Sequence, residues 1–135
     1  QFYRVATDNR YPYFVYGSQQ DRFTYAIASA SDQGVIGPSD TYQVSWSESG
    51  YAIPDPKDPL VTYGSGENII TRFDRRTNQT QFISVWPVDA SGHPASELEH
   101  RFNWTSPLLA SVHSAHTIYW CAERLFKSSD GGHSW

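Results

Sequence analysis

The feature that most constrains the fold of this chain is an internal repeat. Three segments align without gaps on a shared tyrosine, which is Tyr16, Tyr63 or Tyr119 in the successive copies. The first two copies also share an Asp eight residues before the tyrosine and a Gly directly after it. The tyrosines are separated by 47 and then 56 residues. This is close to the ~40–50 residues of a four-stranded propeller blade, with an insertion in the longer interval.

Each copy has the same order of elements. An apolar run is followed by a turn rich in Asp, Pro or Ser, and a second run ends at the shared tyrosine. A polar loop and a third run come next, and in the middle copy a turn leads to a fourth run at 80–85. Short runs separated by regular turn signals indicate an all-β fold. The first runs are 2–7, 50–53 and 106–110, and the third runs are 23–28, 69–73 and 125–127.

Composition agrees with this reading. Aromatic residues make up 16 % of the chain, which favours strands, and nine Gly and eight Pro argue against long helices. The net charge of −4 and the scattered basic residues argue against a nucleic-acid partner. No apolar run is long enough for a membrane helix. We therefore predict a partial β-propeller of about three four-stranded antiparallel blades, at about residues 1–45, 46–101 and 102–135, the last one truncated.

The last eight residues fit the Asp-box pattern S-x-D-x-G-x-[ST]-W at every specified position. In this pattern a short Asp can bind turn amides, a Gly can adopt positive φ, and the Trp returns to the core. The motif closes and stabilises a hairpin turn, so it indicates a structural role and not catalysis. Its residues here include Ser128, Asp130, Gly132 and Trp135, and residues 74–78 occupy the same slot in the middle repeat as a degenerate copy.

The chain as a whole resembles the large bacterial Asp-box (BNR) repeat proteins, which are described as glycosyl hydrolase-like and are related to sortilin-type propellers. Stretches that carry the resemblance, in order, are 8–21, 48–50, 55–59, 71–77, 83–87, 101–107 and 125–128. It implies seven or more blades, usually in an exported protein, without one established activity. Because both ends look like cuts, we expect a fragment of an extracytoplasmic protein, periplasmic or secreted, with its signal peptide missing and the remaining blades as partners.

Functional groups are expected on one face of a propeller, where loops join strands two and three and where links lead to the next blade. An acidic, aromatic rim there suits a sugar or a cationic peptide. Asp21 and Glu48 are also the candidate catalytic carboxylates. The candidate ligand-binding residues are Gln20, Asp21, Trp46, Glu48, Glu67, Arg101, Trp104 and Glu123. We expect no metal site and no cofactor.

Three functions remain open at this stage. The first is a binding module that recognises carbohydrate or peptide on the loop face. The second is a glycoside hydrolase, similar to sialidase or xyloglucanase propellers, which needs two carboxylates at ~5–5.5 Å or ~6.5–9.5 Å. The third is a purely structural repeat segment. The sequence shows no complete catalytic set, so we favour binding.

Overall fold

The computed structural model describes residues 1–135, and it is built almost entirely of β-strands. The first eight strands are β1 (Phe2–Thr7), β2 (Phe14–Gln19), β3 (Thr24–Ala28), β4 (Thr41–Ser45), β5 (Ala52–Pro54), β6 (Val61–Gly66), β7 (Ile69–Asp74) and β8 (Gln79–Phe82). The last three are β9 (Leu108–Ala110), β10 (Ile118–Cys121) and β11 (Leu125–Ser128). Two short 3-10 helices, η1 (Pro38–Asp40) and η2 (Ala95–Glu97), lie in the connections. The prediction of an all-β chain is confirmed.

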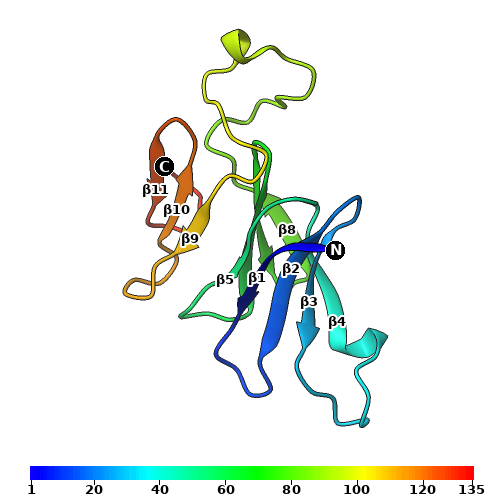
Figure 1. Ribbon diagram of the computed structural model, residues 1–135. Coiled ribbons are helices and arrows are strands. Elements are labelled where there is room, and N and C mark those ends of the chain that lie inside the picture. The colour runs from blue at the N-terminus through cyan, green and yellow to red at the C-terminus, as the bar shows by residue number, and fades with distance from the viewer.

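The strands form three separate antiparallel sheets (Figure 1). The first sheet has the order β1-β2-β3-β4, the second β5-β6-β7-β8, and the third β9-β10-β11. Each sheet is therefore a meander in which neighbours in sequence are neighbours in space. None of the sheets closes on itself. The third sheet has three strands.

The register of the three sheets follows the sequence repeat. Each shared tyrosine pairs with the first strand of its own sheet, and the pairs are Ala6–Tyr16, Ile53–Tyr63 and Leu109–Tyr119. In every pair the tyrosine comes ten residues after its partner. The three tyrosines are therefore structurally equivalent, as the alignment predicted.

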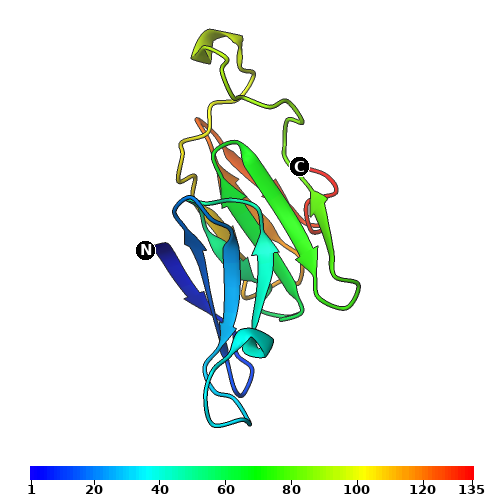
Figure 2. The ribbon, with the colours of Figure 1, turned by 90° about the vertical axis from the view of Figure 1, so that its right-hand side faces the viewer.

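The sheets stack in series, each packing on the next in the same sense (Figure 2). We call the side of each sheet that carries the shared tyrosine its tyrosine face, and the other side its back face. The tyrosine face of the first sheet, with Tyr16 and Val44, packs on Ala52 and Phe73 of the back face of the second. The tyrosine face of the second sheet, with Tyr63, packs in turn on the back face of the third.

The second interface contains the larger core. Val61, Tyr63 and Ile70 of the second sheet meet Ile118 and Trp120 of the third, and all five are fully buried. Alternation along a strand sends successive side chains to opposite faces, so the middle sheet contributes to both interfaces. This explains why every residue of β6 is buried.

The first strands of the three sheets adjoin one another, β1 beside β5 and β5 beside β9. The fourth strands β4 and β8 are the edge strands of their sheets, opposite β1 and β5. No helix of the structure is long and apolar enough to cross a membrane.

Candidate functional site

The predicted binding residues gather at one end of the stacked sheets. The turns β2–β3, β6–β7 and β10–β11 lie at this end, together with the links β4–β5 and β8–β9; the latter includes η2 and projects at the top of Figure 1. Asp21 and Glu67 adopt left-handed backbone conformations, with φ of 53° and 54°. Such conformations are uncommon outside glycine and tighten both turns. We call the residues Gln20, Asp21, Trp46, Glu48, Glu67 and Trp104 the rim.

Glu48 joins the first two sheets at the rim. Its Oε2 atom accepts a hydrogen bond of 2.8 Å from the backbone N–H of Asp21 and a long one of 3.5 Å from Gln20 Nε2. The Gln20 amide also donates to Asp21 Oδ1 at 3.0 Å. The link before β5 is thereby held against the β2–β3 turn. Glu48 and Asp21, the candidate catalytic carboxylates, are therefore brought together.

A cleft of about 270 Å³ opens beside this junction. Glu48 and Glu67 both line it, and Trp46 and Arg22 complete its aromatic and basic sides. The Trp46 side chain is 60 % exposed although its ring packs edge-on against Phe23, with centroids 5.2 Å apart. An indole that is anchored on one side and open on the other presents a flat apolar surface to the cleft.

A second cleft of about 310 Å³ lies on the other side of Glu67. It is lined by Trp104 and Phe102 and by residues of the β8–β9 link, among them Leu98. The carbonyl of Trp104 accepts hydrogen bonds from the Glu67 N–H at 2.9 Å and from Ser49 Oγ at 3.0 Å. These bonds fix the backbone around Glu67, while its exposed carboxylate accepts no hydrogen bond from the protein. Glu67 thus lines both clefts, and no protein donor holds its carboxylate.

Tyr3 belongs to this end of the molecule although the sequence reasoning did not select it. Its hydroxyl donates to Gln20 Oε1, and its ring meets Trp104 edge-on, with centroids 5.9 Å apart. Tyr3 therefore connects the start of β1 to the segment that precedes β9. The only signal in the sequence was an aromatic residue at the loop end of a first strand. Such a residue cannot be told from an ordinary strand residue by the sequence pattern alone.

Arg101 and Glu123 form a separate contact on the third sheet. Glu123 Oε2 accepts a 2.8 Å hydrogen bond from the Arg101 N–H, and Oε1 lies 3.0 Å from His100 Nδ1. The backbone hydrogen bond from Arg101, with the His100 contact, lowers the pKa of Glu123 to about 2. Both carboxylate oxygens are therefore used to hold the link against the β10–β11 turn, so a structural role suits Glu123 better than ligand binding.

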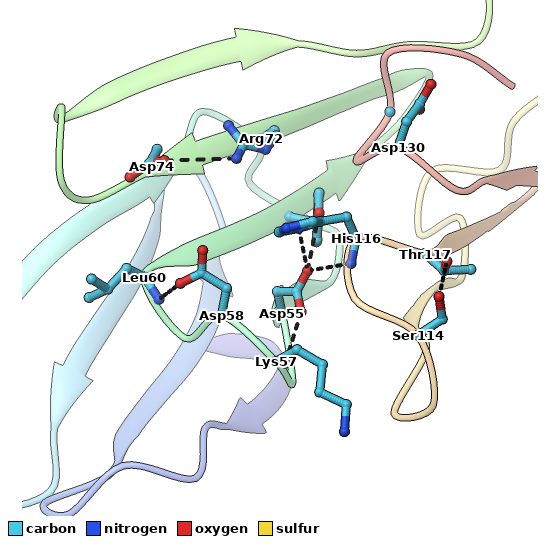
Figure 3. A network of polar contacts seen from close by, with 12 residues as sticks. Asp55, Lys57, Asp58, Leu60, Arg72, Asp74, Ser114, His116, Thr117 and Asp130 are labelled. Carbon is cyan, nitrogen blue, oxygen red and sulfur yellow. Dashed lines mark hydrogen bonds and ion pairs between the residues drawn. The ribbon is translucent and has the colours of Figure 1, made fainter.

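The opposite end of the stack holds a buried acidic residue (Figure 3). Asp55, 2 % exposed, accepts hydrogen bonds at Oδ2 from the His116 N–H at 3.0 Å and from Tyr63 Oη at 3.4 Å. His116 Nδ1 lies 3.1 Å from the same oxygen, and the Lys57 N–H donates to Oδ1. Asp55 thus ties the second sheet to the third. Sequence reasoning assigned no such role to His116, whose partner is 61 positions away.

The turn at residues 128–135 is closed by hydrogen bonds to Asp130. Asp130 Oδ1 accepts hydrogen bonds from Ser128 Oγ at 2.7 Å and from the Ser134 N–H at 2.9 Å, and Oδ2 accepts one from Ser134 Oγ at 2.6 Å. Gly131 and Gly132 have φ of 74° and 94°. The half-buried Trp135 packs against the core and donates from Nε1 to the Ile83 carbonyl at 2.8 Å.

We expect Asp130→Ala to destabilise the protein at neutral pH and to destabilise it by a smaller amount at pH 2. Hydrogen bonds from Ser134 and Ser128 lower the pKa of Asp130, so its contribution is complete above pH about 4 and is lost as pH falls through the folded-state value. Thermal unfolding at pH 7 and pH 2 measures this. An equal loss at both pH values would contradict the role of the carboxylate, and Asp32→Ala in the exposed β3–η1 loop is the control.

Comparison of the chain with protein-family models, with curated proteins and with solved structures found no match. No group of three or more His, Cys, Asp or Glu side chains is placed to hold a metal ion.

Proposed function

We propose that this chain is a binding module in which three consecutive propeller blades present a carbohydrate site at the rim. The observation that carries the proposal is the position of Glu67 between two clefts, each walled by an exposed tryptophan, Trp46 in one and Trp104 in the other. The remaining blades, which would complete the ring, follow from the resemblance to Asp-box repeat proteins.

The packing of the sheets supports the propeller part of the proposal. Blades of a propeller are four-stranded meanders that stack around an axis with their first strands innermost. Here the first strands β1, β5 and β9 are neighbours, and the same two faces meet at both interfaces.

The chemistry of the rim supports a carbohydrate ligand. Sugar hydroxyls donate hydrogen bonds, which a free carboxylate such as Glu67 accepts, and the apolar faces of sugar rings stack on exposed indoles. The sites of small ligands combine apolar walls with a few polar groups that fix orientation, and both clefts have this composition. A cationic peptide would use the carboxylates but has less use for two flat rings.

Binding is favoured over glycoside hydrolysis by the setting of the carboxylates. An acid catalyst must be kept protonated, and an apolar environment does this in known glycosidases. Glu67 is exposed, and Glu48 accepts hydrogen bonds from the neighbouring turn. The Glu48 carboxylate is thus engaged as a hydrogen-bond acceptor, and Glu67 is open to solvent.

The test is calorimetric titration of the protein with a panel of neutral oligosaccharides, with oligolysine as the peptide probe. We expect Glu67→Gln and Trp104→Ala each to weaken oligosaccharide binding at least about tenfold, equivalent to about 1.4 kcal/mol. Matched controls are Glu99→Gln and Trp86→Ala, which change an exposed Glu and an exposed Trp outside both clefts. Binding of oligolysine alone, or oligosaccharide binding that Glu67→Gln leaves unchanged, would refute the proposal.

A further inference from the structure

The two clefts of the rim are built in the same way. Trp46 lies in the β4–β5 link and Trp104 in the β8–β9 link, and each link leads from the last strand of one sheet to the first strand of the next. The β6–β7 turn, which carries Glu67, forms a wall of both clefts. The repeat of the sheets therefore places an exposed indole on each side of one carboxylate.

Hydrogen bonds hold the two indole-bearing links in place. The carbonyl of Trp104 accepts a 3.0 Å hydrogen bond from the Oγ of Ser49, which belongs to the β4–β5 link. The same carbonyl accepts a 2.9 Å hydrogen bond from the Glu67 N–H. Ser47 Oγ, also in the β4–β5 link, donates to the Ser65 carbonyl of β6 at 3.0 Å. The spacing of the two clefts is thus fixed before a ligand binds, and such preorganisation favours a ligand whose units have the matching spacing.

Each cleft has the size of a site for one small unit. Their volumes of about 270 Å³ and 310 Å³ lie at the lower end of the ~300–1,000 Å³ that small-molecule sites occupy. Each cleft also offers a single flat surface, since Trp46 is 60 % exposed and Trp104 is 48 % exposed. A sugar ring stacks on one indole at a time. A ligand that uses both indoles therefore contains several linked rings.

We propose that the ligand is a neutral chain of linked sugars that crosses the β6–β7 turn, with rings in both clefts. This inference rests on the proposed carbohydrate site, and it adds that the site recognises a chain and not a single sugar. Glu67 lies at the centre of the path. Its exposed carboxylate has two acceptor oxygens and no protein donor, so it accepts hydrogen bonds from the hydroxyls of rings on both sides.

Charge favours a neutral chain over an acidic one. Glu48 and Glu67 both line the cleft of Trp46, and Arg22 is the one basic residue among its walls. The cleft of Trp104 has no basic residue in its walls, so Glu67 is unopposed there. A chain of uronic acids would bring further carboxylates against these two, and like charges repel. Neutral hydroxyls instead supply the donors that the carboxylates accept.

The experiment measures affinity against chain length. The probes for calorimetry are β-1,4-linked oligomers of glucose, mannose and xylose with two to six rings, and a six-ring oligogalacturonate. In a neutral series that binds, we expect the hexasaccharide to bind at least about tenfold more tightly than the disaccharide, with one hexasaccharide per protein. Trp46→Ala and Trp104→Ala should each lose this gain. Trp86→Ala, which changes an exposed tryptophan outside both clefts, should keep it. The oligogalacturonate should bind more weakly than the neutral hexasaccharide.

Four results would overturn the inference and leave the carbohydrate site standing. They are a disaccharide that binds as tightly as the hexasaccharide, hexasaccharide binding that Trp46→Ala leaves unchanged, two hexasaccharides bound per protein, and tighter binding of the oligogalacturonate. If no oligosaccharide of any series binds, the proposed function itself is refuted, and this inference with it.

A second variant guards against loss of the fold at position 46, where the indole packs on Phe23. If circular dichroism shows that Trp46→Ala is unfolded, Trp46→Leu replaces it, because leucine keeps apolar volume against Phe23 without a flat ring. The same loss of the chain-length gain is expected, and a gain that Trp46→Leu retains would overturn the inference.

Discussion

Gly50→Ala is expected to destabilise this protein by at least about 4 kcal/mol, enough to prevent folding in a domain of ordinary stability. A Cβ atom at position 50 would lie 1.1 Å from the carbonyl oxygen of Ser65 and 2.1 Å from its carbonyl carbon. Ser65 lies in β6, and the Ser65 N–H donates a 2.8 Å hydrogen bond to the Tyr51 carbonyl. The new methyl group therefore meets a backbone that is itself held in the sheet, so neither side can move without breaking the pairing of β5 with β6.

Gly37→Ala is the matched control. No atom lies within 4 Å of a Cβ at position 37, and its φ of −130° suits any residue. We expect the free energy of unfolding of this variant to lie within about 1 kcal/mol of that of the unmodified protein, because alanine only restricts the unfolded chain. Denaturation by urea, followed by circular dichroism, measures both variants. If the Gly50→Ala protein proved as stable as the Gly37→Ala protein, the close approach of position 50 to the Ser65 carbonyl would be contradicted.

Trp120→Ala is expected to cost about 3–5 kcal/mol, the usual loss when a large buried aromatic side chain is truncated. Trp120 is fully buried between the second and third sheets. Its ring stacks on Phe102, with ring centroids 3.9 Å apart and an interplanar angle of 20°. It also packs against Trp135, and the centroids of these two rings are 6.2 Å apart. Removal of the indole opens a cavity at the interface and also deprives the β8–β9 link of its anchor at Phe102.

Trp120→Phe separates the packing from the polar group. Trp120 Nε1 is buried and has no hydrogen-bond partner, so the indole N–H itself contributes nothing favourable. Phenylalanine keeps an aromatic ring against Phe102, and we expect it to lose less than half as much stability as alanine. Equilibrium unfolding of the two variants measures this difference. Equal losses would contradict the assignment of the stability loss to aromatic packing against Phe102.

The repeat predicted much of the local structure because hairpin pairing is decided by short stretches of sequence. The expected run 2–7 is β1, and the expected third runs overlap β3, β7 and β11. The turn at residues 128–135 was predictable for the same reason, since Asp130, Ser128 and Ser134 bind one another within seven residues. The long insertion before Trp104 was placed correctly on the loop face, but its contacts with Glu123 and Asn68 were not foreseen.

By itself the sequence determined the number of sheets, the order of strands in each and the end at which the rim residues lie, because alternation, turn residues and the spacing of the tyrosines are local properties. Only the tertiary structure decided which rim residue remains free. Glu67 and Glu123 occupy equivalent turns, yet the Glu123 carboxylate accepts a hydrogen bond from the backbone of Arg101, while Glu67 lines two clefts and its carboxylate accepts no hydrogen bond from the protein. The bond between Asp55 and His116 and the direction of stacking were also decided there, since both depend on how separate sheets pack and not on any spacing along the chain.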